Sequence, residues 1–338
     1  MTQVIQAETK YRDPLRRLTA TPLVTDLDIM GRKVRLETNS AVLFSGLSAL
    51  FAGGARSSST PPDFLWRLIG EQDSGAHSPW PEMAAFSDEG LRYVNLGQRS
   101  FFAVDLDSCQ AIAFLSEKLV SDPVGLSSVF AATLFDMTAS ALGLAQIAAA
   151  CVALHGKALL VFGPPRSGKT TSTYLAGKLG LEFHADQASF LDLKPEGLRV
   201  WGQFWPAAFR PDSVQFLPEL EGSTGSFTYG NLTFLCFAKH PFQAPRAQAV
   251  TPVGSVFLER QVADVPLLIP MAPAEREDRL NNCLSFQDDE RFTTQYSSAL
   301  RALGKLPAYR LPYGDDPAVA ATFLRSILMV HNSLEAPR

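Results

Sequence analysis

The sequence predicts an α/β protein in which a smaller β-rich α+β domain (residues 1–125) precedes a mixed α/β domain (residues 126–338). Three observations predict it. The first part contains short segments that alternate apolar and polar residues, as half-buried strands do. The second part alternates apolar runs of strand length with segments that can be helical. The 338 residues, 46% hydrophobic and 19% charged, are enough for two domains with a substantial core.

In the first part, three segments predict strands. Arg32–Glu37 alternates polar and apolar residues, and Leu91–Leu96 is expected to pair with Ser100–Asp105 around a turn that contains glycine. Two segments rich in Ser, Pro and Gly, residues 55–62 and 72–79, are predicted to be loops.

A long Ala- and Leu-rich stretch between Ser127 and Phe162 could be mistaken for a membrane span. A span needs roughly 20 strongly apolar residues, whereas this stretch is interrupted by the polar residues Asp136, Gln146, His155 and Lys157. A buried helix at about 129–144, a buried strand at about 148–154 and a turn at 155–157 explain it better. We therefore expect no membrane partner.

A glycine-rich loop follows this stretch. Residues 163–171 match the phosphate-binding pattern G-x-x-x-x-G-K-[ST] at every fixed position. The apolar run 158–162 before it has strand length, and residues 170–178 after it can form a helix that ends at Gly180. N–H groups at a helix N-terminus favour an anion. The alternative is an ordinary Gly/Pro turn followed by a helix.

The loop residues have distinct expected roles. Lys169 is predicted to contact the β- and γ-phosphates of a nucleotide, and the Thr170 hydroxyl is predicted to bind Mg²⁺. Pro164 and Pro165 lack an N–H, but they lie in the first half of the loop, away from most of the expected donors. The predicted nucleotide-binding residues are Gly163, Arg166, Ser167, Gly168, Lys169, Thr170 and Thr171.

A carboxylate is predicted to return to this loop. The short connection between Lys169 and Asp186 has room for one helix and one strand, so Phe183–Asp186 is expected to be a strand that ends beside the phosphates. A solvated aspartate at a strand end is the alternative. Further strands are expected at about 181–193, 232–237 and 255–260, and a last helix at 317–331.

Loop, short helix and a strand that ends in an acidic residue together resemble the C-terminal domain of HPr kinase/phosphorylase and its relatives, some of them encoded with peptide-tailoring clusters. The resemblance is most specific from Ala148 to Leu193 and looser to about residue 330. It implies that residues 126–338 form a P-loop kinase-like domain with a phosphoenolpyruvate-carboxykinase-like nucleotide fold. It also implies ATP and Mg²⁺ as cofactors, and phosphoryl transfer to a serine hydroxyl of a protein or peptide.

The resemblance implies a role for Asp186 as the catalytic base, and Asp186 and Thr170 are expected to hold the metal. Two departures from the family pattern affect this reading. The family usually has an acidic pair where this chain has Asp186 and Gln187, and its members tend to carry a histidine where this chain has Ala148. The alternative is therefore a nucleotide-binding regulatory or scaffold protein that has lost transfer activity. A kinase for a small molecule is a third reading.

Two arginines are further candidates. Arg210 follows an aromatic, proline-containing stretch and is predicted to be catalytic together with Lys169, holding a phosphate by two hydrogen bonds. Its alternative role is to support aromatic packing. Arg260 ends an apolar strand, where it would neutralise charge on the transferred group or, as its alternative role, form an ion pair on an edge strand.

Composition excludes several other classes. A net charge of −4 gives no sign of a nucleic-acid partner. The charged N-terminal segment lacks the apolar core of a secretion signal. The 4 cysteines lie far apart, as expected for reduced thiols of a cytoplasmic protein, and the 5 histidines show no metal-ligand spacing. A homo-oligomer is left open.

Overall fold

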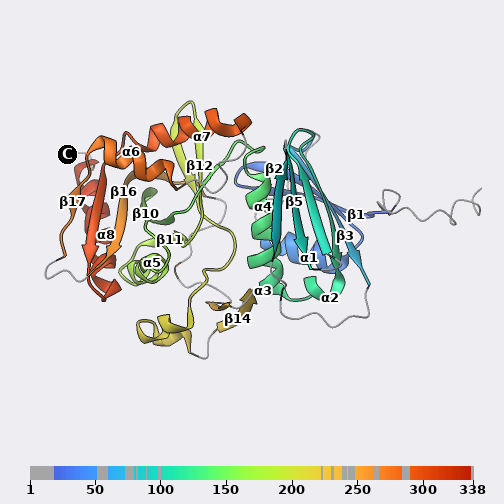
Figure 1. The fold of residues 1–338 in the computed structure, drawn as a ribbon, viewed down its shortest axis with the longest axis horizontal. Coiled ribbons are helices and arrows are strands. Elements are labelled where there is room, and N and C mark those ends of the chain that lie inside the picture. Colours follow the sequence, from blue (N-terminus) through green and yellow to red (C-terminus); the bar gives the residue numbers. More distant parts are fainter. Residues whose placement is uncertain are drawn as a thin grey trace, which may run out of the picture.

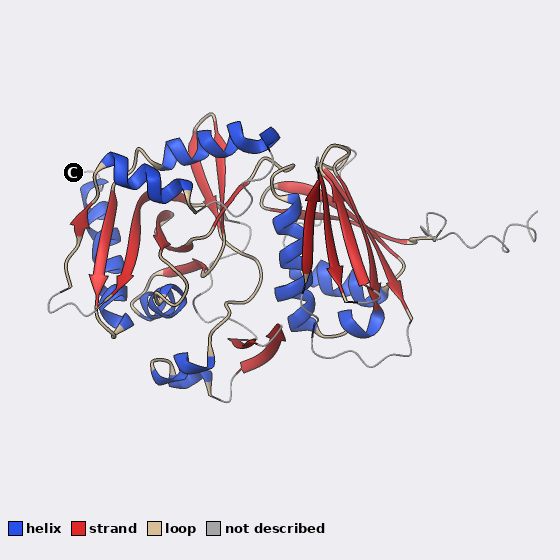
Figure 2. Cartoon of the chain, in the orientation of Figure 1, coloured by secondary structure: helices blue, strands red, loops and turns tan. Residues whose placement is uncertain are grey.

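The computed structural model describes residues 19–51, 60–72, 80, 83–88, 90–97, 100–221, 224–229, 232–237, 242, 248–261, 266–283 and 290–335. Within these residues the chain is a mixed α/β protein with several sheets, which confirms the predicted class (Figure 1). A seven-stranded sheet with its helices lies beside a unit that contains a six-stranded sheet and two smaller ones (Figure 2).

The seven-stranded sheet contains all three strands predicted in the first part of the chain. Its strands β2 (Arg32–Thr38), β3 (Phe64–Glu71) and β7 (Gln110–Ser116) are parallel neighbours and the other pairs are antiparallel. Most of the two predicted loops, 55–62 and 72–79, lies outside the described residues. In spatial order the strands are β1 (Leu23–Ile29), β2 (Arg32–Thr38), β3 (Phe64–Glu71), β7 (Gln110–Ser116), β6 (Ser100–Asp105), β5 (Leu91–Leu96) and β4 (Ala84–Asp88).

Helices cover one face of this sheet. Alternate residues of β2, Val34 and Leu36, are buried beneath them, and Phe130 meets Phe102 of β6 edge to face with ring centroids 5.6 Å apart. The domain boundary after residue 125 remains a prediction. Apolar residues between 126 and 144 belong to the same hydrophobic cluster as the residues of this sheet. The helices are α1 (Ala41–Leu50), α2 (Glu117–Val120), α3 (Pro123–Gly125), the π-helical turn η2 (Leu126–Ala131) and α4 (Ala132–Thr138).

The expected helix at 129–144 is wrong at its C-terminal end. Helix α4 ends at Thr138, because the chain turns through Gly143, whose φ of 76° is in the left-handed region that favours glycine. The turn leads directly into β8 (Ala145–Ile147), and the expected strand at 148–154 begins only at Ala150. Ala148 therefore lies between two strands.

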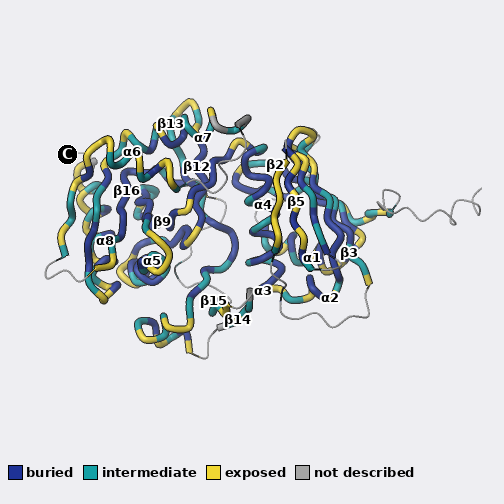
Figure 3. The backbone as a smooth tube through the Cα atoms, viewed as in Figure 1, coloured by how far each residue is buried: buried dark blue, intermediate teal, exposed yellow. Residues whose placement is uncertain are grey.

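The six-stranded sheet is the core of the second unit. Along β10 (Lys157–Phe162), Ala158, Leu160 and Phe162 face one hydrophobic cluster, while Leu159 and Val161 face another. Its neighbours β9 and β16 are also mostly buried (Figure 3). Burial on both faces explains why β10 is a continuous apolar run in the sequence. In spatial order the strands are β11 (Glu182–Ala185), β9 (Ala150–Leu154), β10 (Lys157–Phe162), β16 (Thr251–Arg260), β18 (Ala308–Tyr313) and β17 (Ile269–Pro270).

Helices cover both faces of this sheet. Helices α5 (Lys169–Lys178) and α8 (Pro317–Glu335) pack on one face, and α6 (Pro273–Asn281) and α7 (Glu290–Leu303) on the other. Strands β10, β16 and β18 are parallel, so their C-terminal ends open at one edge, where ligands of α/β sheets bind. The predicted final helix is confirmed as α8. No helix in the described part of the chain is long and apolar enough to cross a membrane.

The remaining strands form two smaller sheets. Strand β12 (Ser189–Lys194) pairs with β8 and with β13 (Gly197–Trp201). Strands β14 (Thr224–Tyr229) and β15 (Leu232–Phe237) form a separate hairpin, and the short 3₁₀ helices η3 (Pro211–Gln215) and η4 (Pro218–Leu220) precede it.

A buried ion pair joins the seven-stranded sheet to the second unit. Arg32 on β2 donates to both oxygens of Asp192 on β12, at 2.8 and 2.9 Å, and to the carbonyl of Leu142 at 3.0 Å. The Trp201 indole donates to the same carboxylate at 3.2 Å. Burial opposes ionisation of Asp192, but the hydrogen bonds from Arg32 and Trp201 outweigh it and hold the pKa below its usual range.

Replacing Asp192 with alanine should destabilise the protein by about 3–5 kcal/mol, because Arg32 would remain buried without its partner. The Lys194→Ala variant is the control, since Lys194 is more exposed and 3.4 Å from the same carboxylate, and it should cost about 0–1 kcal/mol. Urea unfolding measures both losses of stability.

The contribution of the Arg32–Asp192 pair to the free energy of unfolding should be present above roughly pH 4 and fall as acid protonates Asp192. Equal losses in the two variants would contradict this account.

Candidate functional site

The glycine-rich loop connects the C-terminal end of β10 to the first turn of α5. Both pattern glycines have positive φ, 154° at Gly163 and 82° at Gly168. A Cβ on Gly163 would overlap the Ser167 hydroxyl, and one on Gly168 would overlap the hydroxyl of Tyr313. Tyr313 also donates to the Ser167 carbonyl at 2.5 Å. The fixed glycines of the pattern are therefore required by the backbone conformation and by close packing.

The N-terminus of α5 has no side-chain cap. Its N-cap residue is Gly168, and no side chain accepts from the first N–H groups in the part of the chain that the structure describes. The orphan N–H groups of a helix start, with the positive end of the helix dipole, attract an anion. Thr170 and Thr171 lie in this first turn. The start of α5 is thus an open position for a negatively charged group.

Lys169 turns back over the loop. Its ammonium donates to the carbonyl of Gly163 at 2.6 Å and to that of Pro164 at 3.1 Å. Burial lowers the pKa of this ammonium, and the negative charge of Asp186 opposes the shift. A positive charge therefore lies along the loop, close to the start of the helix.

Asp186, directly after β11, lies beside the same helix start. One carboxylate oxygen, Oδ2, accepts from the Thr170 hydroxyl at 3.4 Å and from the N–H of Ala208 at 3.1 Å. The other, Oδ1, is buried and has no hydrogen-bond partner among the described residues. Burial raises the pKa of Asp186 to about 6, against the opposing hydrogen bonds. With only 1% of its surface exposed, this residue is not a solvated strand-end aspartate.

A buried glutamine that sequence reasoning missed positions the turn after β11. The Gln203 side-chain oxygen accepts from the backbone N–H groups of Asp186, at 3.0 Å, and Gln187, at 3.2 Å. Its amide nitrogen donates to the carbonyl of Trp205 at 3.2 Å. Gln203 thus ties the strand end to the segment that supplies the Ala208 N–H. Gln203 belongs to no motif in the sequence, so no local signal indicated its contacts with Asp186 and Gln187.

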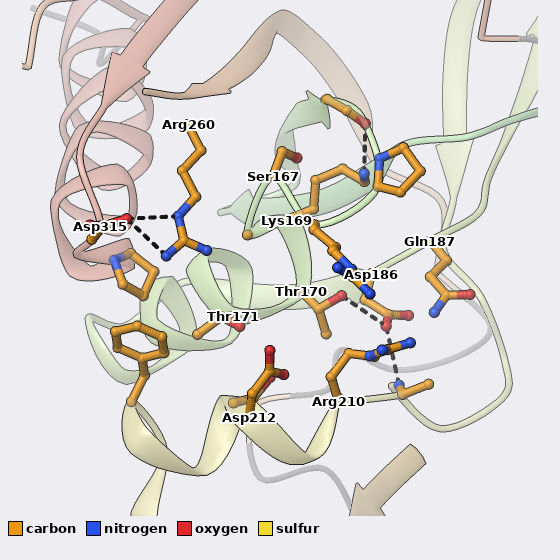
Figure 4. Close-up of a pocket in the computed structure, with 18 of the residues that line it drawn as sticks. Ser167, Lys169, Thr170, Thr171, Asp186, Gln187, Arg210, Asp212, Arg260 and Asp315 are labelled. Carbon is orange, nitrogen blue, oxygen red and sulfur yellow. Dashed lines mark hydrogen bonds and ion pairs between the residues drawn. The ribbon is translucent and has the colours of Figure 1, made fainter. Parts of the chain in front are cut away.

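The predicted residues line one cavity of about 680 Å³. Figure 4 shows Thr170, Asp186, Gln187 and Arg210 on one side and the ion pair of Arg260 and Asp315 on the other. Arg260 donates to Asp315 at 2.9 and 3.1 Å, so the predicted ion pair is present, but its strand β16 lies between β10 and β18 and is not an edge strand. Predicted residues that line the cavity are Ala148, Gly163, Arg166, Ser167, Gly168, Lys169, Thr170, Thr171, Asp186, Gln187, Arg210 and Arg260.

Comparison with solved structures shows a distant similarity. No protein-family model matches the chain, and no curated protein matches its sequence. Among solved structures, the Hpr(Ser) kinase/phosphatase from Coxiella burnetii is similar over 55% of this chain and 98% of that chain. The identity is 12% and the TM-score is 0.29.

Replacing Gly168 with alanine should destabilise the protein more than the same change at Gly180. Both glycines have positive φ, 82° and 94°, so an alanine in either position meets a backbone cost of about 1–2 kcal/mol. At Gly180 nothing lies within 4 Å of the added Cβ, whereas at Gly168 the Tyr313 hydroxyl is in the way.

Thermal unfolding of the two variants measures the difference. Adding Tyr313→Phe to the Gly168→Ala variant should restore part of the lost stability, because it removes the overlapping oxygen. Equal destabilisation at both positions would show that the hydroxyl does not restrict the loop.

Proposed function

We propose that this protein is a kinase of the HPr-kinase-like group, with a phosphoenolpyruvate-carboxykinase-like nucleotide fold. It transfers the γ-phosphoryl group of ATP to a hydroxyl, that of a serine in a protein or peptide. One observation carries the proposal: the buried carboxylate of Asp186, with one oxygen that has no hydrogen-bond partner among the described residues, lies beside a helix start that no described side chain caps. Phosphoryl transfer needs mainly positioning and charge neutralisation, which such a site supplies.

The loop end of the cavity suits the phosphates. The open N–H groups at the start of α5 would donate to the β-phosphate, and Lys169 would leave its two carbonyl acceptors to meet the β- and γ-oxygens. Arg210, on the same side of the cavity as Asp186, would donate to the group in transfer. These positive groups compensate the charge that develops as the γ-phosphoryl group leaves.

The same site has oxygen ligands that suit Mg²⁺. Thr170 Oγ1 and Asp186 Oδ2 are 3.4 Å apart, and Asp186 Oδ1 has no partner among the described residues. Nowhere in the described part of the chain do three or more His, Cys, Asp or Glu side chains form a group that could hold a metal ion. Most ligands of a bound Mg²⁺ would thus come from phosphates and water, as is usual for this ion. When bound, it would neutralise phosphate charge.

Asp186 is the proposed base. Its burial, which raises its pKa to about 6, makes the carboxylate more basic than an exposed aspartate. As the acceptor oxygen forms its bond to the γ-phosphorus, the bond from that phosphorus to the β–γ bridging oxygen breaks. Asp186 takes the hydroxyl proton, and ADP leaves. Gln203 and the Ala208 N–H keep the carboxylate in place during this step.

The second candidate function is a nucleotide-binding regulatory or scaffold protein. Gln187 favours it, because this residue lines the cavity where relatives have a second carboxylate and cannot act as a proton acceptor. In that case the phosphate end of the site would still bind a nucleotide, and transfer would be absent.

Lys169→Ala should abolish the thermal stabilisation that Mg²⁺–ATP gives the wild type, because the loop loses the ammonium that would meet the β- and γ-oxygens. Lys178→Ala is the matched control at the other end of the same helix, where the lysine pairs with Glu219. It should keep the shift. A wild type that is stabilised by no nucleotide, or a Lys169→Ala variant that shifts as much as the wild type, would contradict nucleotide binding at this loop.

Asp186→Asn should lower phosphoryl transfer by about 10²–10⁴-fold, the usual worth of a positioned base, and change nucleotide affinity little. Single-turnover transfer from γ-labelled ATP to proteins of a lysate measures the first effect, and ATP titration the second. Asp212→Asn is the control, since Asp212 also lines the cavity. Nucleotide binding without transfer in the wild type would favour the scaffold function. Unchanged transfer in Asp186→Asn would remove Asp186 from the mechanism.

A further inference from the structure

A second cavity of about 190 Å³ lies next to the first and shares three lining residues with it: Gln187, Ala208 and Phe234. We propose that this second cavity, the side pocket, binds an apolar side chain of the acceptor peptide next to the hydroxyl that is phosphorylated. The inference rests on the proposed function and adds the class of acceptor that the site selects.

The lining of the side pocket is mainly apolar. Among the described residues that line it, none has a charged side chain, so a charged group of the acceptor would lose its hydration there without gaining a partner from them. Its volume suits one large apolar side chain. The apolar side chains that line it are Met83, Val129, Trp205, Pro206, Phe227 and Phe234.

Aromatic contacts hold the walls of the side pocket in place. Trp205 is buried and meets the ring of Phe204 edge to face, with centroids 4.9 Å apart. Phe227 and Phe234 stack across the hairpin with centroids 5.3 Å apart. A preformed apolar pocket binds a side chain with little ordering cost.

The side pocket is continuous with the reacting groups. Ala208, which lines it, donates its backbone N–H to Asp186, and the next residue, Phe209, pairs through its backbone with Leu235 at 2.8 Å in both directions. Gln187 follows Asp186 in the chain and lines both cavities. An acceptor with its hydroxyl at Asp186 therefore extends directly into the side pocket.

A polar atom in the side pocket favours a peptide over a simple hydrocarbon. Ser128 lines it, and the buried hydroxyl of this residue has no hydrogen-bond partner among the described residues. A peptide N–H or carbonyl beside the apolar side chain would satisfy this hydroxyl. Ser128 and Val129 belong to η2, which packs with the seven-stranded sheet, so the acceptor would contact both units of the protein.

Serine-centred peptides test the proposal. The peptides differ only in the residues that flank the serine. The 338-residue protein is incubated with each peptide and γ-labelled ATP, and phosphorylation of the peptide is measured. Leu, Met or Phe at one flanking position should raise kcat/KM about 10–200-fold over Asp or Lys. Phe227→Ala should reduce this preference and raise the KM for the peptide, while the KM for ATP stays unchanged. Leu193→Ala, an exposed apolar residue on β12, is the control and should keep the preference.

A binding measurement separates this inference from the proposed function. The same peptides are titrated against the protein with ADP present, by calorimetry. Suppose that no peptide is phosphorylated, that peptides with an apolar neighbour bind more tightly than those with a charged one, and that Phe227→Ala abolishes this difference in affinity. The side pocket is then supported and the proposed phosphoryl transfer is refuted. If peptides are phosphorylated or bound without preference for an apolar neighbour, the side pocket is refuted and the kinase stands. The inference is also refuted if only small hydroxyl compounds are phosphorylated and no peptide binds.

Discussion

The burial of β10 on both of its faces is the constraint on which the site depends. Helices α5 and α8 on one face and α6 and α7 on the other surround this strand, so the chain can leave the sheet only at the strand ends. At the C-terminal end it must turn sharply back to pack α5 on the sheet. Gly163 and Gly168 allow that turn, and the same geometry leaves the start of α5 uncapped at the mouth of the cavity.

The chemistry of the site follows from how unequally its charges are buried. Asp186 is buried and Lys169 is partly buried, and burial shifts the pKa of each toward the value that favours its neutral form. Arg260 and Asp315, across the cavity, remain exposed and pair with each other. The cavity therefore has a partly buried lysine and a buried carboxylate at one side and a solvated ion pair at the other.

Local patterns in the sequence predicted the strands, the loop and the return of Asp186, because each depends on residues close together in the chain. The three predicted strands of the first part and the helix at the C-terminus are present. The predicted C-terminal end of the helix at 129–144 was wrong, because Gly143 and the pairing of β8 with β12 override the apolar pattern. Gln203, Ala208, Tyr313 and Ser128 could not be predicted, because their contacts with the site arise only from tertiary packing.

The late position of β18 in the sequence also determines when the loop can acquire its shape during synthesis. The loop occurs halfway along the chain, but the hydroxyl of Tyr313 that bonds to it comes from one of the last strands. Strand β10 itself needs β16 as a parallel partner, and parallel pairs between distant segments form slowly. The ribosome must therefore complete almost the whole chain before the site exists, and an unfinished chain exposes its most apolar strands in the meantime.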